Sequence, residues 1–170
     1  MMDKKNEKNY AKNFLFPTIS IPFITRLFIV SVLTYLIFNH IFIPLRIRGH
    51  SMTPTYKDGQ INICWRLKYV FSEPKRHDIV VVRYSGKRIM LLKRVVALEG
   101  ELIEFREGQL FIDGKKRKEP YVQSPSHWNL PPRRVEKGHI YLMGDNRGIS
   151  MQQHDFGQTS IKRVMGAPLW

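Results

Sequence analysis

The stretch Asp78-Ile-Val-Val-Val-Arg83 decides the fold class of this chain. Its central residues are all β-branched, and such side chains pack well on the pleated surface of a sheet. Turn-forming residues follow in Ser85-Gly-Lys87, and the segment from Arg88 to Ala97 is again rich in apolar residues. These features predict an antiparallel hairpin with its turn at residues 85–87.

Further short strands are predicted on both sides of this hairpin. They are Ile61–Trp65, Glu101–Arg106, Gln109–Ile112, His139–Met143 and a short last strand around Ile161–Met165. Residues 115–119 are a charge run, typical of a solvated edge or loop, and residues 120–133 hold four prolines, typical of an irregular connection. Because no stretch of this region has a helical period, we predict a mainly β, antiparallel domain over residues 46–170.

An apolar segment that could anchor the chain in a membrane precedes this domain. No formally charged residue occurs in the 19 residues 27–45, which at ~1.5 Å per residue match the hydrocarbon core of a bilayer. Pro17 and Pro22 are expected to break any helix before it, so residues 1–26 are predicted to be a basic cytoplasmic or interfacial segment. A cleavable signal peptide is the alternative, but its apolar region is usually shorter, and Phe42-Ile-Pro-Leu45 offers no small-residue cleavage site.

The charge distribution predicts the topology and the partners. Five basic residues precede the apolar segment, which favours a cytoplasmic N-terminus and an extracytoplasmic domain at the plasma (inner) membrane, in a single-pass arrangement. The chain carries a net charge of +14, which can attract nucleic acid or anionic lipid. It has no helix-turn-helix pattern or aromatic-rich basic stripe, so we expect the lipid bilayer as a partner and no nucleic acid. Cys64 is the only cysteine, which excludes an internal disulfide and favours a small apolar strand residue.

Two residues suggest nucleophilic chemistry. Ser51 lies in Arg48-Gly-His-Ser-Met-Thr-Pro-Thr55, a few residues beyond the apolar segment. A serine needs a base, and Lys93 can serve if its pKa falls from ~10.4 to ~7–8, as burial beside Leu and Val allows. The residues alone leave simpler explanations open: a lysine that extends to solvent, and a Ser/Thr-Pro sequence that caps a short helix.

Histidine and metal chemistry are less well supported. His154 and Asp155 are adjacent, and adjacent side chains generally point apart, so Asp155 would not readily orient His154 as in a triad. His50, next to Ser51, has the same difficulty. The six histidines form no HExxH, paired HxH or Cys/His cluster, so we predict no metal site.

Four stretches together carry a family resemblance. They are Gly49–Thr55, Arg76–Arg83, Lys93–Gly100 and Met143–Arg147, in that order behind one apolar segment. With them the chain resembles the type I signal peptidases, membrane-anchored Ser/Lys proteases with a β-rich core that remove signal peptides. A further stretch, Leu110–Lys115, is also similar. Any one motif is weak, but four in the family's order are highly specific.

The resemblance implies roles for the residues at the matching positions. Ser51 would be the nucleophile and Lys93 the general base. Ser150 would help to orient the lysine amine, and Asp145 and Asn146 would hold their loop near the site. No metal or organic cofactor is implied.

Other matching positions shape the site or depart from the family pattern. Gly49 stands where some members have a serine or threonine that donates to the oxyanion, and Met52 and Pro54 would shape the surroundings of the nucleophile. The usual Asp and Arg that follow the loop serine are replaced by Gln152 and His154. The ion pair that they form in relatives is therefore expected to be absent or rebuilt, with Asp155 as a possible partner.

The resemblance predicts endoproteolysis of membrane-inserted, signal-peptide-bearing precursors with small residues at the first and third positions before the cut. Two alternatives remain. One is a dedicated processing peptidase, for example for pilins of a conjugation system. The other is a catalytically inactive, membrane-anchored binding module, for which the altered loop is the only support.

Overall fold

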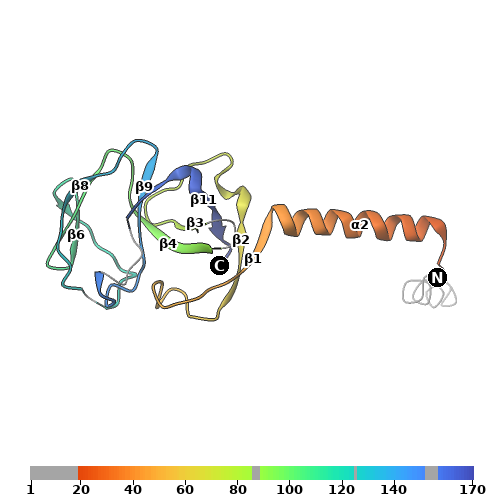
Figure 1. Ribbon diagram of the computed structural model, residues 1–170, viewed down its shortest axis with the longest axis horizontal. Coiled ribbons are helices and arrows are strands. Elements are labelled where there is room, and N and C mark those ends of the chain that lie inside the picture. Colours follow the sequence, from red (N-terminus) through yellow and green to blue (C-terminus); the bar gives the residue numbers. More distant parts are fainter. Residues whose placement is uncertain (1–18, 86–88, 125, 152–156) are drawn as a thin grey trace, which may run out of the picture. The chain divides into compact units, whose positions relative to one another are not determined.

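A computed structural model describes residues 19–85, 89–124, 126–151 and 157–170. The chain divides into two compact units, Met1–His40 and Ile41–Trp170 (Figure 1). The second unit contains all the strands, and they pair antiparallel throughout the described residues. The predicted mainly β fold is therefore confirmed.

The first unit contains one apolar helix, α2, over Ile21–His40. Its most apolar 18-residue window has a mean hydropathy of 2.0, and among the described residues α2 is the one helix long and apolar enough to cross a membrane. The expectation that Pro22 would break this helix is wrong. Pro22 lies in the first turn, where its missing N–H has no intrahelical partner to lose.

The helix also ends earlier than the predicted apolar segment. Residues 42–45 were assigned to that segment, but Phe42–Arg46 forms strand β1 and pairs with β2, with Phe42 opposite Trp65. When an apolar stretch directly follows a helix, its composition alone does not distinguish a continued membrane span from a buried strand. Which of these residues enter a bilayer stays a prediction.

A seven-stranded sheet forms the larger part of the second unit, in the order β1-β2-β11-β3-β4-β9-β10 (Figure 1). Its strands are β1 (Phe42–Arg46), β2 (Ile61–Trp65), β3 (Ile79–Ser85), β4 (Ile89–Ala97), β9 (His139–Met143), β10 (Gly157–Ser160) and β11 (Val164–Pro168). Two short 3-10 helices, η1 (Arg66–Tyr69) and η3 (Ile161–Arg163), connect them. The predicted hairpin is β3–β4. Of its predicted turn, Ser85 belongs to β3, and residues 86 and 87 lie outside the described residues.

A second, four-stranded sheet has the order β7-β6-β5-β8. Its strands are β5 (Leu102–Arg106), β6 (Gln109–Ile112), β7 (Lys115–Lys116) and β8 (Leu130–Arg134). The prediction of irregular structure over residues 120–133 is wrong at its end, because β8 includes Pro131 and Pro132. This strand lies at the edge of its sheet, where a proline removes no hydrogen bond that an inner strand would need.

Strand β4 contributes to more than one hydrophobic core. Its Val95 packs with Val80 and Val82 in the core of the large sheet. Its last residues, Val96 and Ala97, pack instead in a core that also contains the apolar residues of β5 and β6. The strand that carries the candidate base is thus held on both sides, and its position is fixed by the packing of the whole domain.

Two glycines in the small sheet allow a test of this packing. Gly108 and Gly114 both occupy hairpin turns with positive φ, at 76° and 72°. A Cβ at Gly108 would collide with the backbone oxygen of Ser126, whereas a Cβ at Gly114 would meet no atom within 4 Å. The two sites therefore share the same backbone requirement and differ in steric room.

We expect Gly108→Ala to lower the free energy of unfolding by about 2 kcal/mol more than Gly114→Ala, because overpacking typically costs ~1–3 kcal/mol. The backbone cost of positive φ is common to both variants and cancels in the comparison. Urea unfolding of the detergent-solubilised full chain measures the difference. Equal losses in the two variants would contradict the packing of residues 126–128 over this turn.

Candidate active site

A groove of about 540 Å³ borders Ser51. One wall is the segment from Pro44 to Gly49, and the other is formed by Met90–Leu92 of β4 with Val81. Met52 also lines it. The groove therefore places a serine hydroxyl between two stretches of extended chain.

Residues 50–56 form a turn that carries Ser51. The turn is closed by hydrogen bonds from the Thr53 N–H to the His50 carbonyl, at 3.2 Å, and from the Tyr56 N–H to the Met52 carbonyl, at 3.0 Å. Met52 is buried and packs with Ile47 and Tyr56, with Leu92 of β4 against the same cluster. The short helix that Thr53-Pro54 could have capped does not form, and the turn is anchored on β4 instead.

The loop after β9 binds the backbone of this turn directly. The Asn146 N–H donates to the Ser51 carbonyl, and its side-chain amide donates to the His50 carbonyl, each at 3.0 Å. These two bonds hold the turn that carries Ser51 against residues 144–147. They provide the contact that the role predicted for Asn146 requires.

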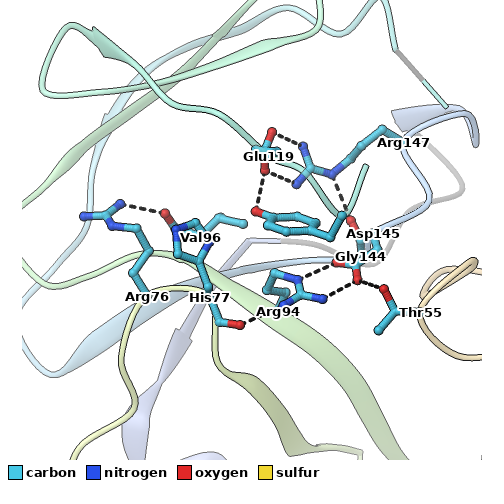
Figure 2. A network of polar contacts seen from close by, with 10 residues as sticks. Thr55, Arg76, His77, Arg94, Val96, Glu119, Gly144, Asp145 and Arg147 are labelled. Atoms are coloured by element: carbon cyan, nitrogen blue, oxygen red, sulfur yellow. Dashed lines mark hydrogen bonds and ion pairs between the residues drawn. The ribbon is translucent and has the colours of Figure 1, made fainter. Parts of the chain in front are cut away.

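Asp145 joins three segments of the site (Figure 2). Its carboxylate is fully buried and accepts two hydrogen bonds from Arg94, at 2.8 and 2.6 Å from Nε and Nη2, and one from Thr55 Oγ1 at 2.5 Å. Burial acts to lower the pKa of the Arg94 guanidinium, but its hydrogen bonds and charge attraction to Asp145 raise that pKa above its ordinary value. The guanidinium thus stays charged, and the bidentate geometry holds the two side chains in one arrangement.

A second buried ion pair extends this network toward the small sheet. Arg147 donates to both carboxylate oxygens of Glu119, at 3.0 and 2.6 Å, and to the Gly144 carbonyl at 2.8 Å (Figure 2). Tyr121 donates its hydroxyl to Glu119 at 2.7 Å, and the Arg94 guanidinium lies 4.0 Å from the centre of the Tyr121 ring. Burial, and then the charge of Glu119, raise the pKa of the Tyr121 hydroxyl, so it stays a donor. The prediction that the charge run is solvated is therefore wrong for Glu119.

Lys93 lies in the middle of β4 and is only 3% exposed. It is opposite Val80, on the same face of the sheet as Leu91, and Leu91 lines the groove together with Ser51. A lysine whose charge extends to solvent is not compatible with this burial. Lys93 itself does not line the groove.

The remaining predicted residues lie around the groove or beyond it. Gly49 lines the groove, whereas Pro54 does not. Ser150 is exposed and follows the Gly144–Arg147 loop, and its contact with the lysine amine stays a prediction. Gln152, His154 and Asp155 lie outside the described residues.

No metal site is found in the part of the chain that the structure describes, because no group of three His, Cys, Asp or Glu side chains converges there. Cys64 is completely buried in β2, and burial raises the pKa of its thiol to about 11. A thiol in that state is a poor nucleophile and a poor metal ligand.

The residues that sequence reasoning missed are those of the charged network. The sequence patterns indicated no role for the side chains of Arg94, Thr55, Glu119 and Tyr121. A signal did exist in the motif Lys93–Gly100, since an arginine inside an otherwise apolar strand requires a buried acid or a path to solvent. Its partner is 51 residues away in sequence, which no local pattern reveals.

We expect Arg94→Met and Asp145→Leu each to lower the free energy of unfolding by roughly 3–5 kcal/mol, because each leaves a buried charge without its partner. The double variant should lose clearly less than the sum of the two. Arg117→Met is the control, since Arg117 is exposed and takes part in no recorded ion pair within the described residues, and it should cost about 0.5 kcal/mol or less. Urea unfolding of the wild type, the two single variants and the double variant gives the coupling free energy between Arg94 and Asp145, and the control is measured in the same way. Strictly additive losses would show that Arg94 and Asp145 do not pair.

Comparison with known proteins identifies the family. The family described as "Signal peptidase, peptidase S26" matches residues 20–168. Signal peptidase I of Bacillus licheniformis is 31% identical, over 91% of this chain and 87% of its own length. Probable signal peptidase I-1 of Synechocystis sp. is 31% identical, over 85% of this chain and 78% of its own.

Two further similarities cover smaller shares. Thylakoidal processing peptidase 1 of Arabidopsis thaliana is 31% identical over 72% of this chain, which spans 39% of that protein. A crystal structure of a signal peptidase I from Enterococcus faecalis matches with a TM-score of 0.46 and 25% identity, over 56% of this chain and 97% of that one. The match over residues 20–168 and the bacterial relatives show that the chain belongs to the signal peptidase family, peptidase S26, and is a serine endopeptidase of the signal peptidase type.

Proposed function

We propose that this protein cleaves signal peptides from exported precursors with Ser51 as nucleophile and Lys93 as general base. One observation carries the proposal: Ser51 lies on a groove, and one wall of this groove is β4, the strand that contains the buried Lys93. A serine is activated by an adjacent base, and a lysine can be that base when it is kept from solvent.

The groove is suited to an extended peptide. Within the described residues, β1 pairs only with β2, so its other edge is unpaired. In β4, residues Met90–Leu92 pair with β3 on one side. On the other side of β4, strand β9 pairs only with the later residues, from Arg94 to Ala97. Both walls thus present strand edges, and an inserted peptide can form main-chain hydrogen bonds to them. Side chains of such a peptide alternate in direction, so its first and third residues before the cut would point to the same side, toward Met52 and Leu92.

The proposed reaction needs no cofactor. Ser51 Oγ attacks the scissile carbonyl while Lys93 accepts the hydroxyl proton, and Lys93 then passes this proton to the leaving amine. Water hydrolyses the acyl-enzyme through the same lysine. The Ser51 N–H would stabilise the oxyanion, because Gly49 provides no side-chain donor. Ser150 would orient the amine between the two steps.

The helix α2 would hold the enzyme and its substrate in one plane. It is apolar and long enough to span a bilayer, and confinement to a surface raises the effective concentration of two partners. The basic residues before it place the N-terminus in the cytoplasm and the catalytic domain outside, at the plasma membrane.

We expect Ser51→Ala and Lys93→Ala each to abolish cleavage of a precursor, and Lys93→Arg to be equally inactive because arginine does not lose its proton in proteins. Lys57→Ala, at an exposed lysine of the same region, is the control and should keep full activity. Cleavage of a small panel of precursors is followed on a gel, and thermal unfolding verifies that each variant is folded. The number of precursors cleaved by the wild type also distinguishes a general from a dedicated peptidase. Substantial activity in either lysine variant would remove Lys93 as the base.

The proposed topology makes a separate prediction. A reporter that is active only outside the cytoplasm, fused after Trp170, should be active, because the positive residues before α2 are retained inside. The same reporter fused to a chain in which Lys4, Lys5, Lys8 and Lys12 are replaced by glutamate should lose much of that activity. A reporter active only in the cytoplasm would reverse the assignment.

A further inference from the structure

A second pocket, of about 340 Å³, lies in the catalytic domain away from Ser51. Four basic residues line it, namely Arg66, Arg83, Lys162 and Arg163, and no Asp or Glu among the described residues does. Four positive charges around one cavity repel each other, and an anion in the cavity would relieve that repulsion. The proposed signal-peptide cleavage does not use this pocket.

The basic residues come from elements that the fold brings together. Arg66 begins η1, Arg83 lies near the end of β3, and Lys162 and Arg163 form the end of η3 just before β11. The Arg83 guanidinium contacts the Met165 sulfur at 3.1 Å, which holds it toward the pocket.

Among the described residues, the structure records no ion pair for Arg83, Lys162 or Arg163. Tyr69 also lines the pocket, and its hydroxyl donates to Asp78 at 3.1 Å. Asp78 already accepts a second hydrogen bond, from the Lys75 N–H at 2.9 Å. The pocket thus presents several cations to a ligand from outside the chain.

This pocket lies close to the first residue of the second unit. The Arg66 N–H donates to the Ile41 carbonyl at 2.9 Å, and Ile41 directly follows the last residue of α2. If α2 spans the bilayer, as in the proposed function, Arg66 lies within one hydrogen bond of the point where the chain leaves the membrane. A cavity at that point is within reach of lipid headgroups.

Apolar side chains beside the pocket fit the same ligand. Val70 lines the pocket and is 55% exposed, and its neighbour Phe71 is 96% exposed. Exposed aromatic side chains are costly in water but favourable at a membrane interface. A ligand with an anionic phosphate and an adjoining acyl region would satisfy both the cations and this apolar rim.

We propose that the pocket formed by Arg66, Arg83, Lys162 and Arg163 binds the phosphate of an anionic phospholipid headgroup. The bound lipid would tie the catalytic domain to the leaflet next to the end of α2. This inference rests on the proposed role of α2 as a membrane anchor, but not on the Ser51–Lys93 chemistry.

The test uses the full chain in nonionic detergent micelles that contain an increasing mole fraction of phosphatidylglycerol. Native mass spectrometry gives the mole fraction at which half of the chains carry one lipid. Phosphatidylcholine with the same acyl chains tests the need for a net negative headgroup, and inorganic phosphate tests a free anion. The pocket variant is Arg83→Gln, Lys162→Gln, Arg163→Gln. The control variant removes the same charge at exposed positions of the other sheet, Lys115→Gln, Lys116→Gln, Lys118→Gln.

The pocket variant should need about ten-fold more phosphatidylglycerol or more for half-saturation, and the control variant should change by less than about two-fold, because basic residues close to the anionic headgroups contribute most to lipid binding. Phosphatidylcholine should bind weakly to all chains. Equal weakening in both variants, or equal binding of the two lipids, would overturn the proposal. Saturation by inorganic phosphate alone would assign the pocket to a free anion instead.

Two further measurements keep these outcomes separate from folding and from catalysis. The pocket variant should cleave a short peptide in lipid-free micelles as the wild type does. If it fails to fold, the single variant Arg163→Gln replaces the pocket variant, and Lys118→Gln replaces the control variant. Ser51→Ala should bind phosphatidylglycerol as the wild type does. Failure of the dyad would therefore show in the cleavage assay alone, and failure of the lipid site in the binding assay alone.

Discussion

The buried carboxylate of Asp145 is the constraint on which the site depends. A carboxylate without exposure to water is costly unless its oxygens are satisfied, and here Arg94 and Thr55 satisfy them with three hydrogen bonds. The three residues come from the loop after β9, from β4 and from the turn that carries Ser51. The chain can bury this charge only when these segments meet, so the same interaction that completes the fold also brings the turn of Ser51 to the strand of Lys93.

The network continues from this point into the small sheet. Arg94 stacks on Tyr121, Tyr121 donates to Glu119, and Glu119 pairs with Arg147, which follows Asp145 by two residues. The loop at residues 144–147 is thus held from both sides by buried ion pairs. The connection before β8, which looks irregular in sequence, has a specific part in supporting the site.

The sequence predicts this molecule well where the pattern is local. The β-branched run at Ile79–Val82 and the Gly turns give the strands of both sheets, and the motifs locate Ser51 and Asp145. The errors occur where two structures share one composition: Phe42–Leu45 suits a membrane span and a strand alike, and the prolines of β8 are tolerated because it is an edge. The burial of Glu119 within a run of exposed charges could not be predicted, because the Arg147 that pairs with it is distant in sequence.

The central claim is that a buried lysine, neutral when it acts, takes the proton of Ser51. The most direct test is the rate of precursor cleavage under single-turnover conditions as a function of pH. We expect the cleavage rate to rise about ten-fold per pH unit from about pH 5 and to level off at or below about pH 9, because only the neutral amine of Lys93 accepts a proton. A rate that is constant over this range, in protein shown to be folded throughout, would contradict it.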